Sequence, residues 1–440
     1  MALVLMVVHG TDGDVLPFVR VAGALRDRGH RVTVFSHQYY ASAVRRAGLD
    51  FVPVDTVAEY EHYLRDAAGQ VGATEARDFR DHFVRSGLLT QLRFECRELR
   101  DRYRPGETVL VGSAISGQSV LIAAEALDAP VVCLAHAPFQ LMALTGVARA
   151  YRLALADEIN SVRAEWALPP VRDWSAWMAS ADAYVGLWPD WFDRAGQPAP
   201  AGTELAGFVL ADEDAEPDLP ERARALLAGA TAPVLVTGGT GRLLRRRFYH
   251  SAVAAIESLG RPGLLVVRHR DLVPDPLPPD VHWFDRLPFR AVVPRVSAVV
   301  HHGGIGTLGR ALAGGTPQVI LADGLDRPDN ASRLARHGVA RWLPPERWTA
   351  TDIADSLRRP SPTLADPAAG PPPSKPRSPE PVDGSPTERQ PAPKSVDGSP
   401  TEGQSTPEPA DGAPPEGPRR AAWLVERAYA RRSSPREAST

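Results

Sequence analysis

Glycines, histidines and hydroxyls gather where one apolar segment of the sequence ends. Residues 298–300 form an apolar run typical of a buried strand, and a helical pattern begins at Ile305, so the intervening residues fall on a strand-to-helix turn. Glycines there let an anion approach the main chain, and the amides opening the next helix present unpaired N–H groups at the positive end of its dipole. The turn therefore predicts a phosphate site, formed by His302, Gly303, Gly304, Gly306 and Thr307.

An acidic segment follows the next apolar run. Residues 318–321 predict another parallel strand, and residues 323–330 form an acidic loop before a new amphipathic helix. Ligands of open α/β sheets bind at the edge where the parallel strands end, so this loop should lie beside the glycine turn. A carboxylate next to an anion site suits a nucleotide-sugar, with His302 at the diphosphate and Asp326 at sugar hydroxyls. The alternative is a glycine turn that only shapes the chain.

Residues 299–342 resemble the nucleotide-binding motif of family 1 glycosyltransferases. The resemblance implies an α/β GT-B fold, in which two Rossmann-like parallel-sheet domains face each other across a cleft. It also implies inverting transfer of a sugar from a UDP- or dTDP-sugar, with His302 at the diphosphate and the Thr307 hydroxyl completing the cradle. Many members carry Asp-Gln in the acidic loop, whereas Asp326 is followed here by Arg327.

Arg327 has two alternative roles. It turns outward and pairs with Asp323 or Asp329 in a solvated contact, which leaves Asp326 to hold the sugar alone. Alternatively it enters the site and selects an acidic sugar through bidentate contact with a carboxylate. We favour the outward orientation, because charged loop residues are usually solvated and nothing else nearby indicates an acidic donor.

The first loop of the chain supplies the candidate catalytic base. Residues 2–10 predict a buried strand rather than a secretion signal, and a glycine turn leads into an amphipathic helix. Asp14 either caps that helix or projects into the cleft, where it would accept a proton from an acceptor hydroxyl. The pattern Gly-x-x-Gly-Asp-Val-x-Pro resembles the first loop of glycopeptide-antibiotic and sterol glycosyltransferases, which favours the catalytic role. His9 is the rival base.

Loops after the later strands are expected to form the acceptor walls. Strands are predicted at residues 31–35, 51–54, 109–111 and 131–134, with helical patterns at residues 76–102 and 118–127. After the last of these strands, His136 and Phe139 are the candidate acceptor-binding residues. Five tryptophans between residues 151 and 191 are interpreted as core packing of a helix pair rather than as an acceptor groove.

A further resemblance, to rhamnolipid rhamnosyltransferases, covers roughly residues 2–358 and includes the Asp-Asn-Ala-x-Arg-Leu pattern of residues 329–334. Together with the antibiotic enzymes it implies a small hydrophobic natural product or lipid as acceptor and a dTDP-deoxyhexose as donor. The strand at residues 233–237 ends in glycines, and the resemblance implies that Thr240 there approaches the diphosphate. Strands follow at residues 264–267 and 281–284, and Leu287, before a proline, is expected to bind the base through its main chain.

Length and composition fit a two-domain enzyme. With 440 residues the chain exceeds what one core usually supports. A formal net charge of −3 gives no basic footprint for nucleic acid, and no apolar run approaches the roughly 20 residues that span a bilayer. Cys96 and Cys133 can form neither a disulfide framework nor a zinc cluster, which is typical of a reducing compartment. We therefore expect a cytoplasmic protein, and a homodimer is compatible with this reading.

The expected domain organisation has five parts. Residues 360–418 hold 18 of the 43 prolines and no aromatic, Ile or Met residue, a composition that predicts disorder. Helical periodicity returns at residues 419–432 and resembles the family's terminal helix, which crosses back to the first domain. The expected parts are an N-terminal acceptor-binding domain (1–200), a linker with one short strand at 205–210 (201–218), a C-terminal nucleotide-sugar-binding domain (219–358), the proline-rich insert (360–418) and a helix that packs back on the body (419–434).

The sequence thus predicts a hexosyltransferase that needs no metal or other cofactor, because the helix dipole and His302 would neutralise the departing diphosphate. Two alternatives belong to other classes. One is a nucleotide-sugar 2-epimerase on the same fold, and the other is a non-catalytic nucleotide-sugar binder that activates a partner enzyme. A pure binder has no use for a carboxylate in the cleft, so Asp14 argues against the second.

Overall fold

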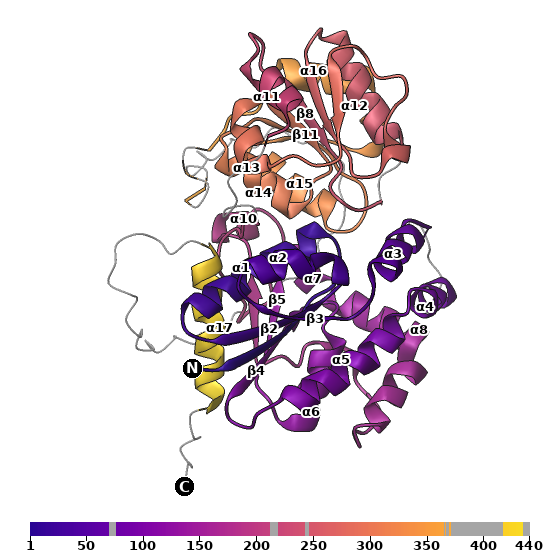
Figure 1. The fold of residues 1–440 in the computed structure, drawn as a ribbon, viewed down its shortest axis with the longest axis vertical. Coiled ribbons are helices and arrows are strands. Elements are labelled where there is room, and N and C mark those ends of the chain that lie inside the picture. Colours follow the sequence, from indigo (N-terminus) through magenta and orange to yellow (C-terminus); the bar gives the residue numbers. More distant parts are fainter. Residues whose placement is uncertain are drawn as a thin grey trace, which may run out of the picture.

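The computed structural model describes residues 1–69, 76–211, 219–242, 246–364, 366, 369–370 and 417–433. Within them the chain forms two lobes, each a parallel sheet with helices on both faces (Figure 1). The predicted α/β fold with two parallel-sheet domains is confirmed. No helix in the described part of the chain is long and apolar enough to cross a lipid bilayer.

The first lobe contains a seven-stranded sheet in the order β3-β2-β1-β4-β5-β6-β7. The strands are β1 (Leu3–Val7), β2 (Arg31–Ser36), β3 (Asp50–Pro53), β4 (Thr108–Ser113), β5 (Val131–Ala135), β6 (Ala183–Gly186) and β7 (Glu204–Leu205). Strand order reverses between β1 and β4, which pair in parallel, so the loops after them open a crevice at the carboxyl edge of the sheet.

Helices pack on both faces of this sheet. They are α1 (Asp12–Asp27), α2 (Ala41–Arg46), α3 (Val57–Gly69), α4 (Ala76–Arg85), α5 (Leu88–Arg102), α6 (Gln118–Leu127), α7 (Pro138–Met142), α8 (Leu144–Ala164), α9 (Trp174–Met178) and α10 (Asp190–Arg194). The helical pattern expected over residues 76–102 is broken at Gly87, whose φ of 71° ends one helix and begins the next. Core packing is confirmed for four of the five tryptophans, Trp174, Trp177, Trp188 and Trp191, which are buried, while Trp166 is partly buried against the same core.

The second lobe repeats the topology of the first. Its six strands, in the order β10-β9-β8-β11-β12-β13, are β8 (Val234–Thr237), β9 (Gly263–Val266), β10 (Val281–Phe284), β11 (Ala298–His301), β12 (Gln318–Leu321) and β13 (Arg341–Leu343). Its helices are α11 (Glu221–Ala228), α12 (Arg246–Ser258), α13 (Phe289–Val292), α14 (Ile305–Ala313), α15 (Arg327–Arg336) and α16 (Ala350–Arg358). The reversal here falls between β8 and β11, so the glycine turn after β11 lies at that crevice.

Three expectations about elements are wrong in detail. The strand expected over residues 205–210 is reduced to β7, which covers only Glu204–Leu205. The acidic loop expected over residues 323–330 is shorter, because α15 already begins at Arg327 with a proline in its first turn. Strands β6 and β13 have no counterpart among the predicted strands, and they are only four and three residues long.

Helix α17 (Gly417–Ser433) packs against α1 of the first lobe and continues onto β5 and β6 (Figure 1). Its apolar side buries Ala421, Ala422, Leu424 and Val425 within the first-lobe core. The chain reaches it through residues 371–416, which lie outside the described residues, as does most of the insert expected at residues 360–418. On either side of that gap, a Cβ on Gly370 would lie 2.4 Å from the Trp191 ring, and one on Gly417 would lie 2.3 Å from the Phe208 carbonyl oxygen.

Removing α17 is expected to lower the melting temperature by about 10 °C, because Leu424 and Val425 each contribute about 2 kcal/mol of apolar burial. The measurement compares two variants by calorimetry. One lacks residues 371–416 and joins α17 through a short flexible linker, and the other lacks residues 371–440. Equal melting temperatures in the two variants would show that α17 contributes no stability to the first lobe.

Candidate active site

The glycine turn after β11 is tightly packed. Gly303 has a φ of 90°, and a Cβ there would lie 3.0 Å from the main-chain oxygen of Arg327. A Cβ on Gly304, the residue before α14, would lie 2.4 Å from Nε2 of His302. Both positions therefore need glycine, for its left-handed conformation at Gly303 and for close approach at Gly304. The Thr307 and Leu308 N–H groups donate to the Gly304 carbonyl oxygen, so Ile305 and Gly306 supply the N–H groups at the start of α14 that lack a partner within the helix and suit an anion.

His302 is enclosed by the two crevice loops of the second lobe. A Cβ on Gly239, in the loop after β8, would lie 2.8 Å from Cε1 of the His302 ring. Burial places the pKa of His302 well below its usual value, and the positive charge of Arg327 and the neighbouring His301 lower it further. The ring is therefore neutral and offers a hydrogen bond rather than a charge to an anion. Its Nδ1 atom is buried and has no hydrogen-bond partner among the described residues.

His301 holds the turn in shape, a role that the sequence analysis did not assign. Its Nδ1 accepts a hydrogen bond from the Gly303 N–H (3.2 Å), and its Nε2 lies 3.0 Å from the Gln318 side-chain oxygen on β12. Burial lowers the pKa of His301 to about 4, so the ring is neutral and carries its proton on Nε2. His301 therefore shapes the turn, and the adjacent His302 is the histidine proposed to face the ligand.

Asp326 lies at the start of α15 and is tied to the glycine turn by Asn330. The Asn330 Nδ2 atom donates to Asp326 Oδ2 (2.8 Å) and to the Gly303 carbonyl oxygen (3.1 Å). Burial raises the pKa of Asp326, while His136 and Arg327 oppose that rise. Asn330, which the sequence analysis did not single out, therefore fixes the carboxylate relative to the anion site.

The favoured outward, solvated orientation of Arg327 is wrong. Arg327 is only 9% exposed, and its guanidinium influences the pKa of both His302 and Asp326. Its Nη1 atom does contact Asp323, but through the main-chain oxygen (3.3 Å) rather than the carboxylate. The other proposed partner, Asp329, pairs with Arg333 instead. Arg327 therefore lies inside the site and brings a fixed positive charge to it.

Asp14 caps the start of α1 through one carboxylate oxygen, and its role as a base stays a prediction. Thr11 is the N-cap of α1, and Asp14 three residues later accepts from the Thr11 N–H (2.7 Å) and hydroxyl (3.0 Å) through Oδ2, which forms a capping box. Its other oxygen, Oδ1, lies 3.3 Å from Nε2 of His136. The side chain is 34% exposed, so one oxygen is held rigidly while the other remains open to the cleft.

His9 is engaged elsewhere. Its Nε2 lies 2.6 Å from the Glu95 carboxylate, and both side chains are largely buried. Burial lowers the pKa of His9, but the carboxylates of Glu95 and Asp55 outweigh it and leave the pKa raised. A base must be free to accept a proton from the ligand. His9 is held by Glu95 and tends to remain protonated, so the geometry favours Asp14 over its rival.

A second buried histidine supports the loop that carries Asp14. His37 Nδ1 lies 2.6 Å from Asp55 Oδ2, which sets the proton on Nδ1 and leaves Nε2 to accept the Gly10 N–H (3.2 Å). The Gly10 carbonyl oxygen accepts from the hydroxyls of Tyr40 and Tyr60. Both polar groups of the Gly10 peptide are therefore satisfied by buried side chains, which fixes the turn before α1.

The remaining predicted site residues differ in how exposed they are. Thr240 accepts a hydrogen bond on its hydroxyl from the Asp12 N–H of the first lobe (3.3 Å), so it joins the two lobes next to His302. Gly306 and Thr307 lie in the first turn of α14, partly exposed. Leu287 is buried in the second-lobe core, which leaves only its main chain for a ligand. Phe139 is partly buried in the first turn of α7, and its contact with an acceptor stays a prediction.

A small apolar pocket lies beside His136, between the lobes. It is lined by Pro17, His136, Leu187, Phe208, Val209, Leu210 and Ile305. His136 is the one polar side chain among these, and it is also the neighbour of Asp14. With a volume of about 10 Å³ the pocket has room for about one water molecule, so it marks an apolar surface beside the candidate base rather than a space for a whole acceptor. No cluster of three or more metal-ligating side chains occurs in the described ranges.

Two doubly wound sheets whose carboxyl edges meet, with a glycine turn and a carboxylate between them, define a GT-B protein. Comparisons with known proteins agree. The N-terminal domain model of glycosyltransferase family 28 matches residues 4–133, and the model named "Erythromycin biosynthesis protein CIII-like, C-terminal domain" matches residues 264–388. Each model matches a different part of the chain, so the chain is similar to GT-B glycosyltransferases in both lobes, and its curated relatives include antibiotic glycosyltransferases.

Individual relatives show how far the similarity extends. Aclacinomycin-T 2-deoxy-L-fucose transferase of Streptomyces galilaeus is 37% identical over 24% of this chain and 25% of its own length. Vancomycin aglycone glucosyltransferase of Amycolatopsis orientalis is 26% identical over 76% of this chain and 84% of its own. The chain spans 25%, 19% and 49% of the length of the first three curated relatives. The crystal structure of glycosyltransferase VinC in complex with dTDP has the same fold, with a TM-score of 0.58 at 22% identity over 81% of this chain and 90% of that one.

Proposed function

We propose that the chain is an inverting glycosyltransferase that moves a hexose or deoxyhexose from a UDP- or dTDP-sugar to a hydroxyl of a small hydrophobic natural product or lipid. One observation carries the proposal. Asp14 and His136 of the first lobe face the site that the glycine turn, Asp326 and Arg327 form on the second. A base on one lobe and an anion site on the other suit transfer between two substrates.

The transfer would proceed by direct displacement. The acceptor hydroxyl oxygen attacks the anomeric carbon of the sugar as its proton passes to Oδ1 of Asp14. The bond from the anomeric carbon to the diphosphate oxygen breaks, and the nucleoside diphosphate departs with the electron pair. Because Oδ2 of Asp14 is fixed by Thr11, Oδ1 is presented in one orientation to the acceptor. Nε2 of His136 lies 3.3 Å from this oxygen and can hydrogen-bond to it before and after the proton is transferred.

Charge on the departing diphosphate would be stabilised by three groups of the second lobe. These are the main-chain N–H groups at the start of α14, the neutral His302 ring and the Arg327 guanidinium. Because His302 is uncharged, Arg327 supplies the fixed positive charge of the site. We therefore propose turnover without a bound metal, and Asp326 would accept hydrogen bonds from sugar hydroxyls.

Several features support an apolar acceptor. The side chains around the small pocket beside His136 are almost wholly apolar and come from both lobes, although the pocket itself has room for only about one water molecule. The glycosyltransferases among the relatives have names that include a vancomycin aglycone and 10-deoxymethynolide, both small natural products. We propose that the acceptor belongs to this chemical class and that His136 and Phe139 contact it. A cytoplasmic location and a homodimer remain predictions, which cell fractionation and light scattering would check.

A thermal-stabilisation screen tests the donor class. A UDP- or dTDP-sugar at 100 times its dissociation constant is expected to stabilise the folded protein by about 2.7 kcal/mol. The same donors are then offered with an apolar alcohol acceptor, with and without a chelator, and transfer is followed by release of nucleoside diphosphate. Stabilisation by no nucleotide-sugar would contradict the donor site, and loss of turnover in chelator would contradict metal independence. Release of nucleoside diphosphate without an acceptor would indicate hydrolysis, whereas conversion to another nucleotide-sugar without such release would indicate epimerisation.

A further inference from the structure

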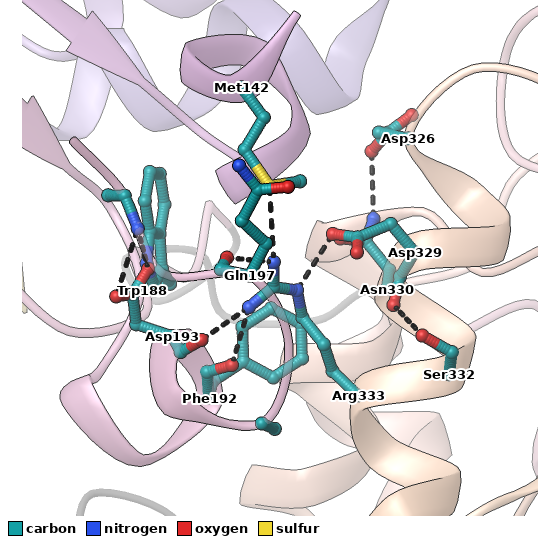
Figure 2. Close-up of polar contacts among 12 residues, drawn as sticks. Met142, Trp188, Phe192, Asp193, Gln197, Asp326, Asp329, Asn330, Ser332 and Arg333 are labelled. Carbon is teal, nitrogen blue, oxygen red and sulfur yellow. Dashed lines mark hydrogen bonds and ion pairs between the residues drawn. The ribbon is translucent and has the colours of Figure 1, made fainter. Parts of the chain in front are cut away.

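Helix α15 carries donor-site residues at its start and contacts the first lobe further along. Its first turn begins next to Asp326 and contains Arg327, and Asn330 binds both Asp326 and the Gly303 carbonyl oxygen. One turn after Asn330, Arg333 leaves the second lobe and enters the first (Figure 2). The same rigid helix therefore bears both the sugar-binding carboxylate and a contact with the acceptor lobe.

Arg333 is fully buried, and every one of its five N–H donors has a partner. Nε donates to Asp329 Oδ2 (2.7 Å) within α15. Nη1 donates to the carbonyl oxygens of Phe192 (3.1 Å) and Asp193 (2.5 Å), and Nη2 donates to that of Gln197 (2.8 Å) and approaches the Met142 sulfur at 3.8 Å. Only arginine has five donors in a fixed planar fork, so the arrangement is specific to this side chain.

The carbonyls that Arg333 binds lie at and just beyond the end of α10 in the first lobe. The last carbonyls of a helix lack partners within it, and a buried carbonyl without a partner is destabilising. Arg333 supplies donors to Phe192 and Asp193, and Arg336 on the next turn of α15 donates to the Ala195 oxygen (2.7 Å). The end of one lobe's helix is thus completed by the side chains of a helix in the other lobe.

Apolar packing surrounds this contact. A single buried cluster contains Trp188 and Phe192 of the first lobe together with Leu308 and Leu334 of the second. The Phe192 ring also lies 5.7 Å from the Arg333 guanidinium carbon. Such a dry, interlocked contact has discrete packed arrangements rather than a continuous range of them.

On the opposite side of the interlobe region, the two lobes meet through charged and aromatic side chains rather than through an apolar cluster. There Arg268 pairs with Glu61 at 2.8 Å and stacks over Tyr39, while Arg286 donates to the Tyr39 hydroxyl at 2.5 Å. The Glu61 side chain is 39% exposed and that of Arg268 is 16% exposed, so the carboxylate of this pair reaches solvent, whereas both partners in the Arg333–Asp329 pair are more enclosed. In Figure 1, α10 and α3, which carries Glu61, lie on opposite sides of the region where the lobes meet. Solvated pairs separate at low cost, whereas the Arg333 contact does not.

We propose that Arg333 is the positioning residue that fixes the donor-sugar site of the second lobe relative to the catalytic base of the first. The inference rests on the proposed transfer reaction for its kinetic consequence, although its geometric consequence is independent of any reaction. The α15–α10 contact is the invariant pivot between the lobes, and the Arg268 contact is the side that opens and closes. Arg333 touches no substrate and acts through α15 on Asp326.

Gly196 offers a way to disturb this contact without deleting the arginine. A Cβ on Gly196 would lie 2.6 Å from Cζ of Arg333 and within 3.0 Å of both Nη atoms. Because the guanidinium is held by five partners, it cannot shift without breaking several of them. Gly146, on α8, has nothing within 4 Å of its corresponding position. Gly196→Ala and Gly146→Ala are therefore a matched pair, and Arg333→Met provides the direct deletion.

The geometric test measures the distance between the lobes in the full chain. Spin labels on Val57→Cys and Glu257→Cys report it, since both native cysteines are buried and Val57 and Glu257 are exposed on opposite lobes. We expect one narrow distance distribution for the parent and for Gly146→Ala, and a broadened or shifted distribution for Gly196→Ala and Arg333→Met. An unchanged distribution in Gly196→Ala, with the protein folded, would overturn the proposal even if Arg333→Met does not fold.

The kinetic test separates positioning from general stability. In Gly196→Ala the transfer kcat should fall by about 100-fold, as a misplacement of about 1 Å can cause. Binding of nucleoside diphosphate alone should change less than twofold, because its site lies within the second lobe. Equal losses in nucleotide binding and kcat would indicate a merely structural role and overturn the proposal. If the parent chain transfers no sugar, the proposed function fails while the distance measurement still decides the role of Arg333.

Discussion

Asp14→Asn is expected to reduce sugar transfer by about 1,000-fold, the usual contribution of a well-placed general base. The amide keeps the size of the carboxylate and can still accept the hydrogen bonds from the Thr11 N–H and hydroxyl, so the capping box of α1 should survive. What it cannot do is take up the acceptor proton. Transfer is measured by nucleoside diphosphate release with saturating donor and acceptor.

Two controls accompany this variant. Its melting temperature should stay near that of the parent, because Asp14 is partly exposed and its structural bonds are retained. Its affinity for nucleoside diphosphate should also be unchanged, since Asp14 belongs to the other lobe. If transfer is retained, Asp14 is not the catalytic base, and His136 is the next residue to test for that role. Lost nucleotide binding would mean instead that the substitution disturbs the interlobe contact between Asp12 and Thr240.

Arg327→Gln is expected to weaken binding of nucleoside diphosphate by about 30-fold, which corresponds to the roughly 2 kcal/mol of a charge-assisted hydrogen bond. The sequence alone favours no change, because a solvated arginine would contribute little. Burial of Arg327 beside the neutral His302 reverses that expectation, since the glutamine removes the fixed charge of the anion site. Titration calorimetry with UDP and dTDP measures the effect directly.

The same substitution should shift the pH dependence of donor binding. Arg327 opposes the burial that raises the pKa of Asp326, so its removal raises that pKa further. Ionised Asp326 accepts hydrogen bonds from a sugar through both oxygens and more strongly than the protonated carboxyl does. As the pH is lowered, binding of the intact donor should therefore weaken at a higher pH in the variant than in the parent. Nucleoside diphosphate without a sugar should show no such shift. If only a uronic-acid donor is affected and diphosphate binding is intact, Arg327 selects an acidic sugar instead.

Much of the fold follows from local pattern. Strands such as β11 and β12 are continuous apolar runs bounded by glycine or proline, and the turn between β11 and α14 follows from glycines that no other residue could replace. Strands β6 and β13 were not predicted; they are four and three residues long, and each is extended by parallel pairing with a neighbouring strand. The spacing of Thr11 and Asp14 is typical of a capping box, in which Thr11 is the N-cap and Asp14 is the third helical residue. The sequence instead suggested Asp14 itself as the N-cap.

Side-chain environments were harder to predict than elements. Nothing in the sequence near Arg327 shows that the residue is buried, because its neighbours in space include Gly303 in the turn after β11 and Tyr249 on α12. The same holds for His301, whose shaping role depends on Gln318 in another strand. Arg333 is the clearest case, since most of its hydrogen-bond acceptors lie more than 130 positions earlier in the chain. Such roles depend on tertiary contacts, which local periodicity does not encode.

The anchored ends of the segment at residues 371–416 have a consequence for how this chain tolerates change. Gly370 lies against Trp191, Gly417 lies against the Phe208 carbonyl oxygen, and the rings of Trp191 and Phe208 are 6.1 Å apart. The segment therefore leaves and rejoins the body at nearly the same place. The entropy of closing a loop grows only with the logarithm of its length, so doubling the segment costs about 0.6 kcal/mol. Its length is thus nearly neutral for the fold, and the junction offers a natural position for inserting a second domain or for new termini in a circular permutation.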